Sequence, residues 1–129
     1  MKNYWGAVVT QEDMSLHDVA AELNRFLFPV KLEETDRFDE VPGFVADRSG
    51  RERFVLQGVP LDLPADAPAS ERYNYFYFRC SEPEIETLPP SLRNLPRDAE
   101  VGRNGYSIIS EYLCQRLCEN TRLRCEPDL

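Results

Sequence analysis

The sequence has little of what most catalytic and nucleotide-binding sites use. Its 129 residues include one histidine and six glycines, and no glycines follow the G-x-G-x-x-G order of a dinucleotide-binding loop. That histidine, His17, precedes Asp18 in an expected helix, where neighbouring side chains point about 100° apart, which disfavours a local Ser-His-Asp arrangement. No acidic spacing matches a calcium loop. We therefore expect no enzymatic activity and no cofactor.

Long apolar runs and an excess of basic residues are also missing. No run reaches the roughly 18 apolar residues of a membrane span, and the N-terminal apolar run is too short for a signal peptide. We expect a cytoplasmic protein whose cysteines stay reduced. The chain has 15 Lys and Arg against 23 Asp and Glu, a net charge of -8. Such a charge repels nucleic acid and anionic membranes and favours a cationic partner, although it also serves solubility alone.

The order of predicted elements indicates an α+β fold in one domain, residues 1–129. Ser15 and Asp18 form a helix-start signal, apolar residues then recur at helical spacing, and Pro29 ends the helix. A second helix is predicted over 107–121, and proline-rich segments such as 81–98 should be irregular. We expect an antiparallel or mixed β-sheet of about five strands packed against these two helices. The predicted strands are 4–10, 30–41, a hairpin over 43–59 with its turn at 48–51, 73–80 and 123–125.

The stretch YNYFYFRC, Tyr73–Cys80, has five aromatic residues in six consecutive positions. Strand alternation sorts Phe76, Phe78 and Cys80 to one face and Tyr73, Tyr75, Tyr77 and Arg79 to the other. The first face suits a core. The tyrosine face is either covered within the fold or exposed as a protein-binding surface, where tyrosine is enriched. Stacking on nucleic-acid bases is disfavoured because the flanking basic residues of such sheets are missing.

Four cysteines raise the question of a metal site. Cys114 and Cys118 have the i, i+4 spacing that places two thiols on one helix face. Cys80 and Cys125 could complete a four-thiolate shell only if the fold brings them together. Both lie in strand-like, otherwise apolar segments, so we interpret the cysteines as small core residues and expect no bound metal.

Acidic residues concentrate in the N-terminal part, where residues 1–47 hold 10 acids and 4 bases. The most acidic stretch lies in the predicted half-exposed strand. If the protein binds a cationic partner, these carboxylates and the tyrosine face are the candidate contacts. The candidate partner-binding residues are Glu33, Glu34, Asp36, Asp39, Glu40, Tyr73, Tyr75 and Tyr77.

The segment GYSIISEYLCQRLCENTRLRCEP, residues 105–127, resembles the closing segment of bacterial immunity proteins that neutralise polymorphic or contact-delivered toxins. The shared pattern is a short apolar strand, Ser-Glu, an amphipathic helix and a last strand. YNYFYF resembles the aromatic strand that precedes this segment in some of them. The resemblance implies an inhibitor that blocks a cognate toxin domain, and a cationic nuclease-type toxin suits an acidic inhibitor. The alternatives are an acidic DNA-mimic regulator and an enzyme with an unrecognised carboxylate site.

Overall fold

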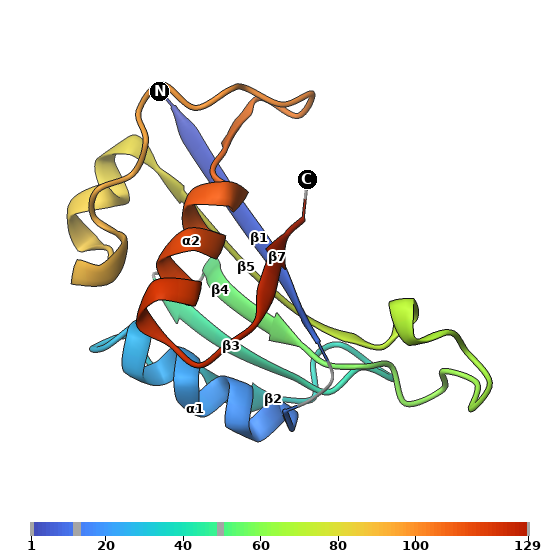
Figure 1. The fold of residues 1–129 in the computed structure, drawn as a ribbon. Coiled ribbons are helices and arrows are strands. Elements are labelled where there is room, and N and C mark those ends of the chain that lie inside the picture. Colours follow the sequence, from blue (N-terminus) through green and yellow to red (C-terminus); the bar gives the residue numbers. More distant parts are fainter. Residues whose placement is uncertain (1, 12–13, 49–50, 129) are drawn as a thin grey trace.

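Two long strands, β1 (Asn3–Gln11) and β5 (Tyr73–Ser81), pair antiparallel in the middle of a mixed β-sheet (Figure 1). The computed structural model describes residues 2–11, 14–48 and 51–128. The seven strands have the order β2-β3-β4-β5-β1-β6, with β7 also paired to β1. Only the β1–β6 pairing is parallel among the described strands. The other strands are β2 (Glu33–Thr35), β3 (Gly43–Arg48), β4 (Arg51–Gln57), β6 (Tyr106–Ile108) and β7 (Cys125–Pro127).

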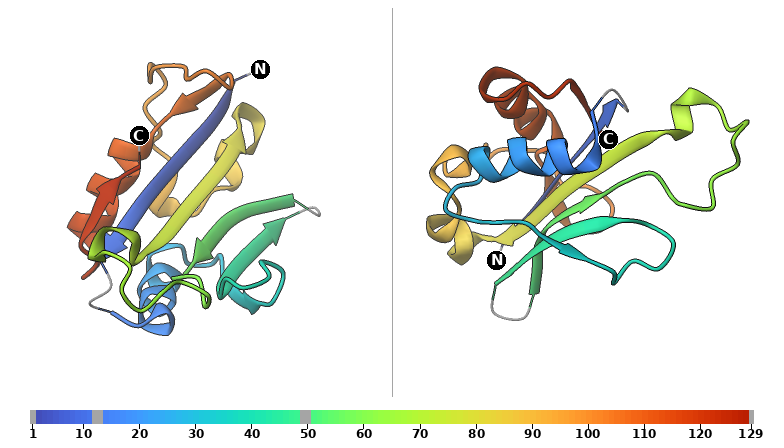
Figure 2. Two further views of the ribbon diagram at one scale, coloured as in Figure 1. Left: turned by 90° about the vertical axis from the view of Figure 1, so that its right-hand side faces the viewer. Right: turned by 90° about the horizontal axis from the view of Figure 1, so that it is seen from below.

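Both α-helices, α1 (Leu16–Phe26) and α2 (Ser110–Asn120), lie on the same side of the sheet (Figures 1 and 2). Helix α1 begins as predicted, because Ser15 Oγ accepts a hydrogen bond from the backbone N–H of Asp18 at 3.1 Å. No helix in the described part of the chain is long and apolar enough to cross a membrane. The described residues also include three short 3₁₀ helices: η1 (Ala69–Glu71), η2 (Glu82–Thr87) and η3 (Pro90–Leu92).

The core lies between the sheet and the two α-helices. Strand alternation places Phe76 and Phe78 of β5 on this side, where both are almost fully buried, as the sequence predicted. The helices meet them with apolar stripes at helical spacing. The fully buried core includes Tyr4, Val8, Leu23, Leu27, Leu56, Leu113 and Leu117.

One edge of β1 is shared by two short strands. β6 pairs with residues 3–5 of β1, and β7 pairs with residues 8–10. Between them, the side-chain oxygen of Ser110, the first residue of α2, accepts a hydrogen bond from the backbone N–H of Ala7 at 3.0 Å. The carbonyl of Ala7 accepts one from the N–H of Asp128 at 2.9 Å. The edge therefore stays hydrogen-bonded across the change from parallel to antiparallel pairing.

The α+β class is confirmed, but several predicted boundaries were wrong. Within the described residues the sheet has seven strands, where about five were expected. The strand expected over 30–41 is reduced to β2, and a turn follows it. The second helix begins at Ser110 and not at 107, because residues 106–108 pair with β1. The last strand is β7, not 123–125, because pairing with β1 begins only at Cys125. Of the hairpin turn expected at 48–51, residues 49 and 50 lie outside the described residues.

Candidate functional site

Helices α1 and α2 leave the other face of the sheet, called the open face below, without an α-helix of their own (Figure 2). This face carries a cluster of aromatic rings. Trp5 stacks on Tyr77 with ring centroids 4.6 Å apart and planes 23° apart. Tyr75 lies beside Tyr77 at 5.6 Å, and Tyr106 meets Trp5 edge-on at 6.3 Å. All four residues are only half-buried. An aromatic surface that neither α1 nor α2 covers is typical of a protein-binding face.

The sheet register explains which side chains share the open face. Directly paired residues point to the same side of a sheet. The pairs run in one row across five strands, from Glu33 through Val45, Val55 and Tyr77 to Ala7. The next residue along each strand belongs to the opposite, helix-covered side. The predicted tyrosine face is therefore the open face, and Tyr73 at the start of β5 is its most exposed tyrosine, at 41%.

The predicted acidic residues do not gather on the open face. Glu33 points to that side, whereas Glu34 is paired with Phe44 on the helix side, where one of its carboxylate oxygens lies 3.5 Å from His17 Nε2. Asp36, Asp39 and Glu40 follow β2 in the turn region. All of these carboxylates are exposed. Strands β3 and β4 separate Glu33 and Glu34 of β2 from the tyrosines, and three strand spacings correspond to roughly 14 Å. Glu40 lies nearer to the tyrosines, because the next residue, Val41, lines one hollow together with Tyr73 and Tyr75.

A hollow lies beside the tyrosines of β5 and combines aromatic and acidic groups. Its volume is about 400 Å³. Tyr73 and Tyr75 line it together with the acidic residues Glu71 and Asp128. Burial is the main cause that raises the pKa of the Tyr75 hydroxyl well above its usual range. The carboxylate of Asp128, which is hydrogen-bonded to this hydroxyl, is the next cause. The remaining lining residues are Val41, Gln57, Gly58, Pro60 and Leu63.

This acidic-aromatic hollow, defined by Glu71, Tyr73, Tyr75 and Asp128, suits one kind of group. Two carboxylates attract a cation, and tyrosine rings bind cations through their faces. An arginine or lysine side chain from a partner has both the charge and the apolar stem for such a lining. A larger hollow of about 480 Å³ lies near β2. It is less selective for a cation, because its lining includes the basic residues Lys31 and Arg37 as well as Glu33 and Glu34.

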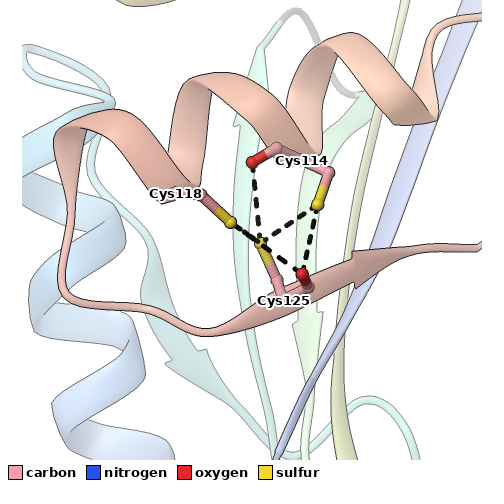
Figure 3. Close-up of side chains that lie close together, drawn as sticks. All are labelled: Cys114, Cys118 and Cys125. Atoms are coloured by element: carbon pink, nitrogen blue, oxygen red, sulfur yellow. Dashed lines mark hydrogen bonds between the residues drawn. The ribbon is translucent and has the colours of Figure 1, made fainter.

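Three of the four cysteines meet at the junction of α2 and β7 (Figure 3). The sulfur of Cys125 lies 3.6 Å from that of Cys114 and 3.5 Å from that of Cys118. All three sulfurs lie within 4.8 Å of one another. Burial is the main cause that raises the pKa of the Cys125 and Cys114 thiols.

The interpretation of all four cysteines as core residues was wrong for Cys118, whereas Cys114 and Cys125 pack against the edge of the core. Cys114 and Cys125 are half-buried and Cys118 is exposed. The interpretation does fit Cys80, which is 3% exposed in the core, where burial raises its pKa to about 11. Cys80 is not part of the cluster, so the four-thiolate shell considered from the sequence does not form among the described residues.

The sequence patterns did not predict several residues of these sites. Trp5 and Tyr106 join the tyrosines only through strand pairing, and Asp128 reaches Tyr75 because β7 pairs with β1. No short sequence motif indicates these contacts.

Comparisons of the chain with protein-family models, curated proteins and solved structures found no match.

Proposed function

We propose that this protein is an immunity protein that binds and neutralises a cognate bacterial toxin domain, with a cationic nuclease-type domain as the partner. It acts by protein–protein contact and performs no chemistry itself. The observation that carries the proposal is the acidic-aromatic hollow on a side of the sheet that neither α1 nor α2 covers. A protein that blocks a cationic active site needs a place for a basic side chain, and this hollow offers carboxylates and tyrosine rings together.

Charge supplies the second support. Nuclease domains hold phosphates with basic side chains, so an inhibitor with a net charge of -8 is attracted to them over a distance. The exposed acids of residues 33–40 have no place in the core and suit this steering role. Their dispersal over both sides of the sheet speaks against the DNA-mimic alternative, which needs carboxylates in line along one face.

The two acidic regions should affect binding in different ways. In the hollow, Glu71 and Asp128 contact the anchoring side chain, so neutralising both should mainly speed dissociation. Neutralising Glu33, Glu34, Asp36 and Asp39 together should mainly slow association and weaken its dependence on salt. The carboxylates of residues 33–39 attract the partner before the two proteins touch, so they affect the association rate. The carboxylates of the hollow hold a side chain of the bound partner, so they affect the dissociation rate.

The test uses a purified cationic nuclease toxin domain encoded beside the gene for this chain. Inhibition of its nuclease activity and the binding rates are measured for the wild type and for Glu71→Gln/Asp128→Asn. The control is Glu86→Gln/Glu100→Gln, which removes the same charge at exposed positions outside the hollow. We expect dissociation to be at least about tenfold faster only in the hollow variant, which corresponds to about 1.4 kcal/mol.

Trp5, the only tryptophan of the chain, reports directly on the open face. Its emission should change when the toxin domain binds and should remain unchanged with a basic protein that is not a toxin. If the wild type neither binds the domain nor inhibits it, the proposed function is wrong. If it inhibits but the hollow and control variants behave alike, the function stands and the assigned anchor is wrong.

A further inference from the structure

We propose that Cys114, Cys118 and Cys125 form a three-thiolate site for one thiophilic d¹⁰ metal ion, Zn²⁺ or Cu⁺. The proposal is independent of toxin binding, because it rests on a cluster at the α2–β7 junction that the open face does not use (Figure 3). Soft thiolates select this class of ion over the hard cations Mg²⁺ and Ca²⁺.

The distances fit one ion between three sulfurs. A metal–sulfur bond of about 2.3 Å places ligand sulfurs about 3.8 Å apart in tetrahedral geometry and about 4.0 Å apart in trigonal geometry. The observed separations from Cys125 are 3.6 Å to Cys114 and 3.5 Å to Cys118. The third separation, between the two helix sulfurs, is at most 4.8 Å. Changes of at most about 1 Å in these separations therefore convert the cluster into a coordination shell.

The fold holds the three ligands in place before an ion arrives. Cys114 and Cys118 lie one turn apart on α2, which is anchored by the fully buried Leu113 and Leu117. Between the helix and Cys125, the hydroxyl of Thr121 donates to the carbonyl of Leu117 at 2.7 Å and accepts from the N–H of Leu123 at 3.1 Å. The reversal of the chain is thus hydrogen-bonded and not a loose connection.

The same turn is tied to helix α1. The buried carboxylate of Glu22 accepts a hydrogen bond from the N–H of Arg122 at 2.8 Å. Cys125 then enters β7, where it pairs with Thr10 of β1. Both sides of the cluster are therefore fixed by contacts that involve none of the sulfurs, as a pre-organised site requires.

Packing and a single disulfide each explain less of the geometry. Cys118 is exposed, so it fills no space in the core. Cys125 is nearly equidistant from two sulfurs, whereas a disulfide joins one pair and leaves the third thiol without a role. Convergence of three sulfurs on one point is what a metal ion requires.

The ligand set also limits the ion. No fourth Cys, His, Asp or Glu joins the cluster from residues 2–11, 14–48 and 51–128. Zn²⁺ would therefore keep a fourth position for water or an external ligand, as three-ligand zinc sites do. Cu⁺ accepts three thiolates as a complete trigonal shell. Both ions use the same three sulfurs, and experiment can separate them.

The test uses the full, tag-free chain, reduced and freed of metal under anaerobic conditions. Zn²⁺ and Cu⁺ are titrated separately against a chelator of known affinity, and bound metal is counted by elemental analysis. We expect one ion per chain. Co²⁺ substitution distinguishes the two ions. Intense tetrahedral thiolate–cobalt absorption identifies a zinc-type site, whereas tight Cu⁺ binding without a stable Co²⁺ complex identifies a trigonal copper site.

Two variants make the test decisive. Cys118→Ser removes an exposed ligand and should leave folding intact, yet it should weaken metal binding more than about 100-fold, beyond the usual effect of changing an outer partner. Cys80→Ala, outside the cluster, should retain one ion with unchanged affinity. The proposal is overturned if neither ion binds stoichiometrically, if Cys118→Ser binds as tightly as the wild type, or if the thiols form only a disulfide.

Discussion

Ser110 provides a sharp test of how β1 is held between two short strands. Its side-chain oxygen accepts the hydrogen bond of the Ala7 N–H at 3.0 Å, and both residues are fully buried. The substitution Ser110→Ala removes the acceptor and changes the side chain by a single oxygen. The Ala7 N–H then stays in the core without a partner, because β6 ends before this position and β7 begins beyond it.

The expected loss of stability follows from this geometry. A buried N–H left without a partner costs about 1–3 kcal/mol. Alanine has a better helix propensity than serine, which offsets at most about 0.5 kcal/mol. We expect Ser110→Ala to lower the free energy of unfolding by about 1–2.5 kcal/mol. For a chain of this length, that corresponds to a fall in Tm of about 4–10 °C.

Urea unfolding, followed by circular dichroism and Trp5 fluorescence, measures this loss. The midpoint should fall while the slope m stays constant, because the exposed surface on unfolding is unchanged. The control is Ser70→Ala in η1, an exposed serine, for which we expect a change below about 0.5 kcal/mol. Equal stability of the two variants would refute the role of Ser110, as would unchanged hydrogen exchange at the Ala7 amide.

Two further predictions concern Glu22 and Tyr75. Glu22→Ala removes the buried carboxylate that pairs with Arg25 and binds Arg122, and should cost about 2–3 kcal/mol in urea unfolding, whereas Glu22→Gln should cost less because it keeps an acceptor oxygen. The raised pKa of Tyr75 favours the neutral phenol in the folded state. The contribution of Tyr75 to the free energy of unfolding is therefore fully present below pH 10.0 and is lost as the pH rises further. Tyr75→Phe should therefore lose less stability in alkali than the wild type, and equal losses would contradict this.

Local patterns predicted the elements whose signals lie within one segment. Ser15 and Pro29 bracket α1 because a helix cap and a helix break each act on their immediate neighbours. The alternation of Phe76 and Tyr77 was readable because a strand of nine residues repeats its period several times. Those signals were enough for the α+β class.

Contacts that depend on pairing between distant segments were not readable. β6 has three residues, too few to distinguish a strand from the start of a helix, and it forms because the edge of β1 is available. The spacing of Cys114 and Cys118 suggested a shared helix face, but nothing local shows that Cys125 joins them while Cys80 does not. Likewise, Trp5 meets Tyr77 only through the β1–β5 register.

β7 connects the two proposed sites and decides how they can be tested separately. Cys125 begins this strand, and Asp128 of the acidic-aromatic hollow follows its last residue. A substitution at Cys125 can therefore disturb both the thiolate cluster and the hollow through one strand. Cys118 lies on α2, outside β7, so Cys118→Ser should weaken metal binding more than about 100-fold and leave the hollow intact. Glu71 precedes β5 and is distant in sequence from the cluster, so Glu71→Gln should change the hollow and leave metal binding unchanged.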